Sequence, residues 1–448
     1  MEVQKVKQNR KLIQTFYVIV ITLLLTNIIN PVTIKAASLD VDAESAIVVD
    51  AETGKVLFAK NPDISLPPAS MTKMMTEYLV WEAIESGQIS WDTTTQISDY
   101  PYELSANPAF SGVGLRQNVQ YTVRELYEAM AINSDNGTSI ALAELIAGTE
   151  GKFVEKMNKK GEEMGLPEFR FVNATGLDNA HLGDNYPEGT DPNGVNLLSA
   201  RSAALLGYYL VRDYPESLEI SKVPQTVFDE QTIINWNWML PHEGSNLKQF
   251  YYEGVDGLKT GFTDLAGYCF TATAERNGKR LIVVVMKTNS YEERFQETKK
   301  LFDYGFNNFN SETLFSAGDQ LAGQSILPVT KGKEKEVEIA LSEGFELMIK
   351  NGEADQYDIE YELDESMLNE KGELIAPIEQ GQKVGRAKLV YTGGEDYGYI
   401  LPNGQEYVDL VTTEAVEQSN WFMITMNSIG EFFSNLFSTI AEKIKGLF

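Results

Sequence analysis

Two pairs of short apolar runs predict β-hairpins within the first 290 residues. The first pair is Ser45–Asp50 and residues 55–60, which are joined by a short turn. The second pair, residues 267–274 and 281–287, flanks the dipeptide Asn277-Gly278. This dipeptide favours a two-residue hairpin turn because Asn and Gly both tolerate a positive φ. We therefore expect antiparallel strands at both places.

Three segments between these hairpins have the composition and length of helices. Pro67-Pro68 stops any earlier helix, and residues 71–86 then form the first of the three. Residues 123–132 and 138–147 are the other two, and the polar stretch 133–137 separates them. The first part of the chain is thus expected to combine helices with antiparallel strands.

The pattern changes after residue 310. Short alternating apolar runs at 337–341, 345–349, 357–361 and 388–391 are separated by Gly, Asn and Asp. Such spacing is typical of a small all-β domain. We predict a β-sandwich over residues 313–412.

Residues 415–448 carry apolar side chains at steps of three and four, which predicts one amphipathic helix. Its apolar stripe consists of Phe422, Met426, Ile429, Phe433, Leu436, Phe437, Ile440, Ile444 and Leu447. The polar opposite face excludes a span but suits a helix lying in the membrane interface. The alternative is docking on the protein's own core. The terminal position and Trp421 favour a membrane anchor.

The N-terminus has the layout of a secretory signal peptide. Lys5, Lys7, Arg10 and Lys11 precede an apolar stretch that ends in Ala36-Ala37-Ser38. A basic start, an apolar middle and a small-residue cleavage zone define such signals. We predict that residues 1–37 are removed on export; the alternative is an uncleaved N-terminal anchor.

Charge and composition exclude several classes of protein. The 448 residues include 37 Lys and Arg against 65 Asp and Glu, a net charge of −28, which argues against nucleic acid as a partner. The single Cys269 excludes an intrachain disulfide and a four-cysteine metal site. His181 and His242 lack partner motifs, and we expect them to be structural or exposed. Cys269 is expected to be a buried small side chain, and neither a metal nor another cofactor is expected.

The segment Ser70-Met71-Thr72-Lys73 places a serine at the start of the first predicted helix. Residues i and i+3 share a helix face, so Lys73 can reach the Ser70 hydroxyl, and the helix N-terminus supplies unpaired N–H groups beside it. The alternative is a simple helix cap. Ser245-Asn246-Leu247-Lys248 repeats the spacing, so the pattern alone is weak.

Two further motifs follow in the chain. Ser134-Asp135-Asn136 lies in the predicted break between helices, although Ser105-Ala106-Asn107 has the same form and a polar turn would also explain it. Lys259-Thr260-Gly261 occurs once, directly before the second hairpin, where a glycine turn is the alternative explanation. Each motif alone is weak evidence for an active site, but the three motifs in this order are strong evidence.

In this order the motifs resemble those of the serine D-alanyl-D-alanine carboxypeptidases, the low-molecular-weight penicillin-binding proteins. The resemblance includes the runs at 68–76, 171–177 and 256–261 and extends over essentially the whole mature chain. The layout is especially similar to Bacillus-type enzymes. It implies an α+β fold, with an antiparallel sheet flanked by helices at 38–312, the small β domain at 313–412 and the amphipathic anchor at 415–448.

The resemblance also implies catalytic roles. Ser70 would attack the carbonyl between the two terminal D-alanines of a peptidoglycan stem peptide and form an acyl-enzyme. No histidine motif offers a base, so Lys73 is the candidate, and the nearby charge of Lys259 would favour its neutral form. Ser134 would relay a proton to the departing D-alanine, and Asn136 would hydrogen-bond the substrate peptide.

Substrate-binding roles follow from the same resemblance. The N–H groups of Ser70 and Phe262 would form the oxyanion hole. Within Lys259-Thr260-Gly261, the first two side chains would hold the terminal carboxylate. Arg294 matches the family's carboxylate-binding arginine, although a solvated surface charge is its ordinary alternative.

Three other functions stay open. A serine β-lactamase shares the motifs, but the chain lacks a Glu-x-x-Leu-Asn segment between Asn136 and Lys259. A wall transpeptidase is disfavoured by the lack of a large N-terminal domain. A catalytically inactive wall-binding scaffold is disfavoured because the motif residues are all present. The expected partners are stem peptides, β-lactam inhibitors and a membrane surface, at the extracytoplasmic face of a bacterial cell membrane.

Overall fold

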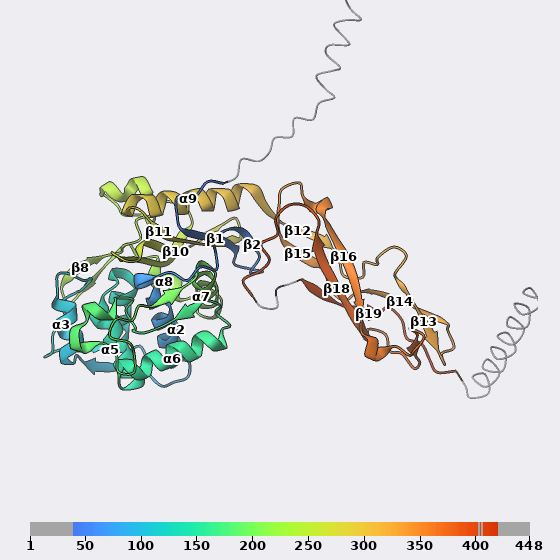
Figure 1. Ribbon diagram of the computed structural model, residues 1–448, viewed down its shortest axis with the longest axis horizontal. Helices are drawn as coiled ribbons and strands as arrows, with labels where there is room; N and C mark the ends of the chain where they lie inside the picture. The colour runs from blue at the N-terminus through green and yellow to red at the C-terminus, as the bar shows by residue number, and fades with distance from the viewer. Residues whose placement is uncertain (1–38, 402–403, 405, 420–448) are drawn as a thin grey trace, which may run out of the picture. The chain divides into compact units, whose positions relative to one another are not determined.

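The computed structural model describes residues 39–401, 404 and 406–419 (Figure 1). From Asp42 onward the described residues belong to one compact unit. The predicted signal peptide at 1–37 lies outside the described residues. The same holds for residues 420–448 of the predicted anchor helix. Its first residues, 415–419, are described and are not helical, because Val416 and Gln418 form β-bridges with Ile378 and Gly332.

A five-stranded antiparallel sheet is the framework of the first part of the chain (Figure 1). Its strand order is β2-β1-β11-β10-β9. The strands are β1 (Ser45–Asp50), β2 (Val56–Lys60), β9 (Val255–Thr263), β10 (Gly267–Arg276) and β11 (Lys279–Thr288). Both predicted hairpins are confirmed, and Asn277 and Gly278 have φ values of 53° and 77°, as the tight turn requires.

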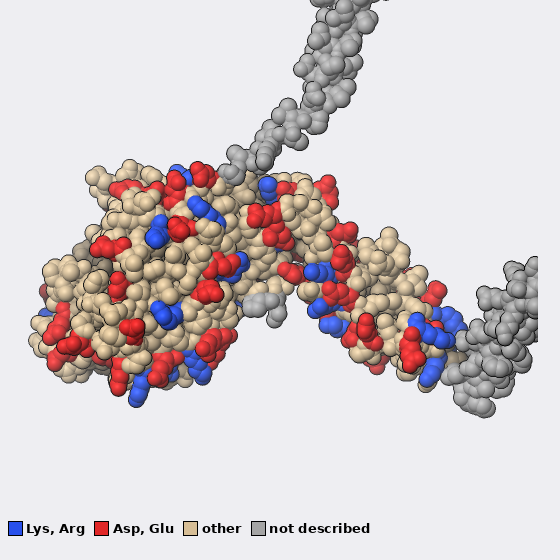
Figure 2. Space-filling view, viewed as in Figure 1, with Lys and Arg blue, Asp and Glu red and all other residues tan. Residues whose placement is uncertain are grey.

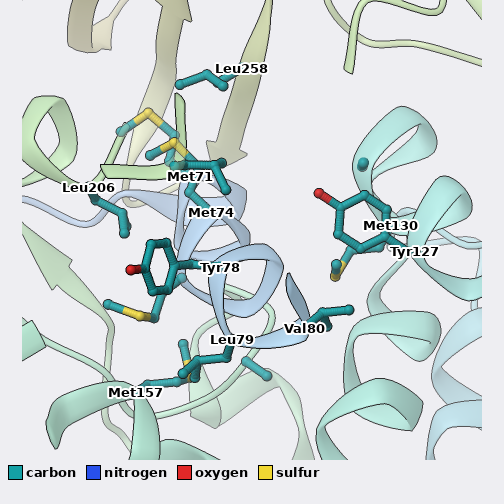
Figure 3. Close-up of a cluster of buried hydrophobic side chains, with 14 of the residues drawn as sticks. Met71, Met74, Tyr78, Leu79, Val80, Tyr127, Met130, Met157, Leu206 and Leu258 are labelled. Atoms are coloured by element: carbon teal, nitrogen blue, oxygen red, sulfur yellow. The ribbon is translucent and has the colours of Figure 1, made fainter. Parts of the chain in front are cut away.

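Helices cover both faces of this sheet. Helix α9 (Tyr291–Asn308) packs on β10 and β11 from one side, and α7 (Ala200–Asp213) packs on β1 and β11 from the other (Figure 1). Helix α2 (Lys73–Glu85) lies within the helical layer and is buried over most of its circumference. Figure 3 shows its Met74, Tyr78 and Leu79 among the buried side chains of the core.

The remaining elements of this part are short. The helices are η1 (Ala69–Thr72), α3 (Asp99–Ala106), α4 (Val123–Glu128), the π-helix η2 (Ala129–Asn133), α5 (Asn136–Ala147), α6 (Glu150–Glu163), α8 (Ser217–Ser221) and the 3-10 turns η3 (Asn179–His181), η4 (Gly183–Asn185) and η5 (Asn246–Phe250). The strand pairs are β3 (Thr94–Gln96) with β4 (Gln120–Thr122), β5 (Phe169–Arg170) with β6 (Leu197–Leu198), and β7 (Gln225–Phe228) with β8 (Gln231–Ile234).

The predicted helix at 71–86 is confirmed, with one difference: a 3-10 turn precedes it, so Ser70 lies in η1 rather than in the α-helix. The predicted helix at 123–132 is also present, but its second half is the π-helix η2. Both differences concern the ends of helices that carry motif residues.

The second part of the chain is all-β apart from short 3-10 turns, as the sequence predicts. β12 (Phe309–Phe315) pairs with β15 (Phe345–Lys350), and a six-stranded sheet has the order β16-β18-β19-β14-β13-β17. Its members are β13 (Ile326–Thr330), β14 (Glu336–Leu341), β16 (Tyr357–Leu363), β17 (Leu374–Ile375), β18 (Lys383–Tyr391) and β19 (Tyr407–Thr412), with turns η6 (Ala354–Gln356) and η7 (Glu365–Met367). Both sheets contribute to one apolar core, which includes Ile339, Leu347 and Leu410.

Acidic and basic side chains are interspersed over the face drawn in Figure 2, and no continuous basic surface appears there. Nucleic-acid binding relies on clustered Lys and Arg that neutralise phosphates. This face therefore offers no support for a nucleic-acid partner.

Candidate active site

A cleft of about 460 Å³ collects most of the residues that the three motifs single out. This volume lies within the range of small-molecule pockets. The predicted residues that line it are Ser70, Ser134, Asn136, Thr260, Gly261, Phe262 and Arg294. Lys73 and Lys259 are buried beside them, at 0% and 2% exposure. The structure therefore brings all three motifs together, although they are far apart in the chain.

Two glycines allow η1 to lie against its neighbours, which fixes the position of Ser70. A Cβ on Gly176 would meet Ala69 O at 1.9 Å, and one on Gly261 of β9 would meet Pro68 O at 2.3 Å. Real Cβ atoms do not approach backbone this closely, so both positions need glycine. The half-buried Ser70 is thus held between β9 and the segment that contains Gly176.

Lys73 forms a buried network directly behind the serine. Its Nζ donates to Ser70 Oγ at 3.1 Å, to Asn136 Oδ1 at 2.8 Å and to Thr175 O at 2.7 Å. Burial, and then the positive charge of Lys259, hold the pKa of Lys73 well below its ordinary value. A lysine of this kind can accept a proton from the hydroxyl that it contacts.

Ser134 has a strained backbone and a free hydroxyl. It lies at the end of the π-helix η2 in the left-handed region, with φ 64° and ψ 28°. The residue is buried, and among the described residues its Oγ has no hydrogen-bond partner. Strain of this kind, and a π-helical turn, occur preferentially at functional sites. The unpartnered hydroxyl borders the cleft and is available to a ligand.

Both polar atoms of the Asn136 side chain form hydrogen bonds within the protein. Its Oδ1 accepts from Lys73, and its Nδ2 donates to Ser111 O at 3.0 Å. The resemblance suggested only a contact with substrate. The structure adds that Asn136 orients Lys73, a partner that lies 63 positions away in the chain.

Asp135, the middle residue of Ser134-Asp135-Asn136, holds the segment from Ser105 to Val113 in place. The sequence did not indicate this role. The buried Asp135 carboxylate accepts from Ser105 Oγ and from Val113 N, both at 2.8 Å, and from Thr138 N at the start of α5. Ser105, which the sequence offered only as a competing match, is therefore a structural partner of the second motif.

Lys259 places a second buried amino group next to the cleft. Burial lowers its pKa to about 8; the charge of Glu77 opposes this shift, and that of Arg294 adds to it. Its Nζ has a weak contact with Thr260 O at 3.5 Å. A buried cation with only a weak hydrogen bond to the protein is well suited to bind an anionic group of a ligand.

Arg294 is buried at 1% exposure, so it is not a solvated surface charge. Its Nη1 donates to Gly261 O at 3.1 Å and to Cys269 O at 3.4 Å, which fixes it beneath β9 and β10. Among the described side chains its Nε has no hydrogen-bond partner. Burial lowers the pKa of Arg294 to about 10.

Trp236 and Leu177 at the rim were not identified from the sequence, whereas Phe262 was. Phe262 stacks on Tyr268 with ring centroids 4.5 Å apart, and Trp236 and Leu177 also line the cleft. His181 lies at the rim as well, with 55% of its side chain exposed, while His242 is buried; the expectation of structural or exposed histidines is confirmed.

Two other sequence expectations are resolved by burial. Cys269 is fully buried, as predicted. The competing match Ser245–Lys248 begins the 3-10 turn η5, which has no buried residue. Ser245 Oγ is used within that turn, where it donates to His242 O. The second copy therefore lacks the buried environment that depresses the pKa of Lys73.

Comparisons with known proteins agree with this geometry. The D-alanyl-D-alanine carboxypeptidase family matches residues 31–290, and the penicillin-binding protein 5 C-terminal domain matches residues 309–418. A D-alanyl-D-alanine carboxypeptidase of Bacillus subtilis, DacF, is 32% identical over 353 residues, which are 79% of this chain and 82% of that protein.

Solved structures give the same result. The peptidoglycan synthesis regulatory factor PBP3 of Streptococcus pneumoniae is 36% identical, with a TM-score of 0.65 over 84% of this chain and 99% of that one. Penicillin-binding protein D2 of Listeria monocytogenes, in its ampicillin-bound form, is 33% identical, with a TM-score of 0.51 over 60% of this chain and 99% of that one.

Proposed function

Because the chain belongs to the D-alanyl-D-alanine carboxypeptidase family, we propose that it removes the terminal D-alanine from peptidoglycan stem peptides through an acyl-enzyme on Ser70. It is a serine-type peptidase with an α+β catalytic part and an all-β C-terminal part. The observation that carries the proposal is the contact of 3.1 Å between Lys73 Nζ and Ser70 Oγ at the edge of the cleft.

Acylation begins when Ser70 Oγ attacks the carbonyl carbon of the penultimate D-alanine. Lys73 accepts the hydroxyl proton, which the depressed pKa of its amine permits. The carbon–nitrogen bond to the terminal D-alanine then breaks. The departing amine takes a proton through Ser134, whose unpartnered hydroxyl borders the cleft. Hydrolysis reverses this order: water attacks the ester, and the proton returns to Ser70.

Two groups of residues bind the substrate in this proposal. Lys259, Thr260 and Arg294 attract the terminal carboxylate, and the buried position of both cations strengthens that attraction. The N–H groups of Ser70 and Phe262 bind the oxyanion that forms during attack. Gly261 lets β9 pass close to η1, so that these donors can converge on one carbonyl.

β-Lactams react at the same serine, because their strained amide and adjacent carboxylate imitate the substrate. The similarity to a penicillin-binding protein solved with ampicillin supports this proposal. After ring opening no amine leaves the site, so the ester persists. Between Asn136 and Lys259 the chain lacks the Glu-x-x-Leu-Asn segment of class A lactamases, which supports slow hydrolysis.

We further propose that the enzyme is exported and held at the outer face of a bacterial cell membrane by an amphipathic helix within residues 420–448. The basic, apolar and small-residue layout of residues 1–37 supports export, and the apolar stripe from Phe422 to Leu447 supports an interfacial anchor. In the part of the chain that the structure describes, no helix is both long and apolar enough to cross a bilayer.

Mass spectrometry with two ligands tests the proposed activity. A pentapeptide ending in D-Ala-D-Ala should release one D-alanine per peptide, and benzylpenicillin should leave a covalent adduct that persists for minutes. Rapid, repeated hydrolysis of penicillin would instead indicate a β-lactamase. Absence of both D-alanine release and an adduct, with a folded protein, would indicate a scaffold.

A further inference from the structure

Glu77 is a buried glutamate that the mechanism above does not use. It lies one helical turn after Lys73 on α2 and is only 4% exposed. Its Oε2 accepts from Tyr127 Oη at 3.3 Å, and Tyr127 Oη in turn accepts from Trp81 Nε1 at 2.8 Å. An ionisable group is expensive to bury without a partner, so its position needs an explanation.

The surroundings of Glu77 contain both site lysines. Lys73 shares its helix face, because residues four apart are neighbours on a helix. Lys259 comes from β9, which packs against α2 and η1, and it interacts electrostatically with Glu77. Figure 3 shows Tyr127 beside Met130 among the buried side chains of the core. Two amines and one carboxylate thus form a buried cluster behind the cleft.

We propose that Glu77 is a positioning residue for the reaction: a buried anion that keeps Lys259 charged, so that Lys259 can attract the substrate carboxylate. This inference rests on the proposed function. Glu77 does not line the cleft, so it acts through Lys259 rather than on the substrate.

The electrostatic balance of the cluster supports this role. Burial raises the pKa of Glu77 to about 7, although Lys259 and the Tyr127 hydroxyl both oppose that shift. Glu77 is therefore neutral in acid and charged in base. Only the charged form raises the pKa of Lys259, which burial and Arg294 lower. Glu77 thus raises the pKa of Lys259 above neutral pH but not below it.

Other charged groups face this cluster and must stay constant in a test. Besides Glu77 itself, Asp135, from the start of α5, and Glu150, from α6, raise the pKa of Lys73. Arg294 from α9 acts on Lys259. None of these three is altered by a substitution at Glu77, so a change in pH dependence can be assigned to Glu77.

The experiment measures the second-order rate constant for acylation by a fluorescent penicillin from pH 6 to pH 9.5, in the full-length wild type and in Glu77→Gln. Glutamine keeps the shape and can still accept from Tyr127. At pH 6 the two proteins should agree within about twofold. At pH 9 the variant should be slower on the order of tenfold or more, because its Lys259 loses its proton at a lower pH.

Two further variants make the result specific. Asp50→Asn is the matched control, because Asp50 is another buried carboxylate with a raised pKa and a hydroxyl donor, Thr53 Oγ1 at 2.5 Å, and it acts on neither Lys73 nor Lys259. It should follow the wild type at every pH. Tyr127→Phe removes the hydrogen bond that lowers the pKa of Glu77. It should fall below the wild type only between about pH 7 and 8.5 and rejoin it at both extremes, since Glu77 then ionises later.

A Glu77→Gln rate that differs from the wild type by one constant factor at all pH values would overturn the inference, since a purely structural role predicts that result. If Glu77→Gln fails to fold, a Tyr127→Phe profile parallel to the wild type overturns it as well. A wild type that is not acylated at any pH would instead refute the proposed function. The two failures are therefore distinguishable.

Discussion

The amine of Lys73 is the group on which the proposed acylation depends most. Lys73→Ala should lower the rate of penicillin acylation by about 10²–10⁴-fold, the range over which a general base contributes. The loss of the Nζ contacts to Asn136 and Thr175 adds to this effect. Stopped-flow acylation kinetics, with circular dichroism to verify folding, measures it. A rate within a few-fold of wild type would show that another group accepts the proton.

The motif residues could be predicted from the sequence, but most of their contacts could not. Ser70 and Lys73 are one helical turn apart, so local geometry alone implied their contact. The bonds from Lys73 to Thr175 and from Asp135 to Val113 join distant segments, and no local pattern indicates them. Glu77 had a weak signal: it is a charged residue in an apolar helical run, four positions after Lys73.

At the scale of elements, the approach of Gly176 to η1 sets the position of the nucleophile. Gly176 has φ +89°, and an added Cβ would lie 1.9 Å from Ala69 O and 2.9 Å from Ser70 N. Gly176→Ala should therefore cost more than the ~1–2 kcal/mol of a left-handed alanine, and it should slow acylation by more than about tenfold.

Gly183→Ala is the control for this prediction. Gly183 also has a positive φ, +61°, but a Cβ there would meet no atom within 4 Å. It should show only the conformational cost and keep wild-type acylation. Urea unfolding and labelling kinetics on both variants separate the two effects. Equal losses in both would mean that the contact with Ala69 does not position Ser70.

Regular elements were easier to predict than irregular ones. The hairpin turn at Asn277-Gly278 depends on backbone preferences of two residues, so the sequence indicated it directly. The π-helix at Ala129–Asn133 and the left-handed Ser134 depend on packing around the cleft. The apolar periodicity of this segment predicts one continuous α-helix. A single π-helical turn, with its i→i+5 hydrogen bonds, has no distinct sequence pattern by which it could be predicted.

At the scale of the whole molecule, the C-terminal segment should determine membrane association without affecting chemistry. Val416 is fully buried in the β domain and Ser419 N bonds Lys331 O, so a deletion should begin after Ser419. Removing residues 420–448 should abolish co-sedimentation with lipid vesicles and leave D-alanine release from a soluble peptide unchanged. Burial of several apolar side chains, at ~1.5–3 kcal/mol each when complete, supplies the expected binding.

Full-length protein with Phe433→Glu and Ile440→Glu is the companion to this deletion, because both changes charge the apolar stripe. It should also lose vesicle binding. If the segment instead packs on the β domain, both forms would keep their sedimentation behaviour and melt at a lower temperature. The start predicted for the C-terminal helix, residue 415, is wrong, because residues 415–419 are not helical and Val416 pairs with Ile378. The bounds of the β domain at 313–412 remain predictions.

Peptide mapping of the penicillin adduct shows whether Ser70 is the nucleophile. In the wild type, digestion and tandem mass spectrometry should place the penicilloyl group on Ser70. Folded Ser70→Ala should carry no adduct and release no D-alanine. An adduct that persists in Ser70→Ala, or one that maps to Ser245 in either protein, would show that Ser70 is not the nucleophile.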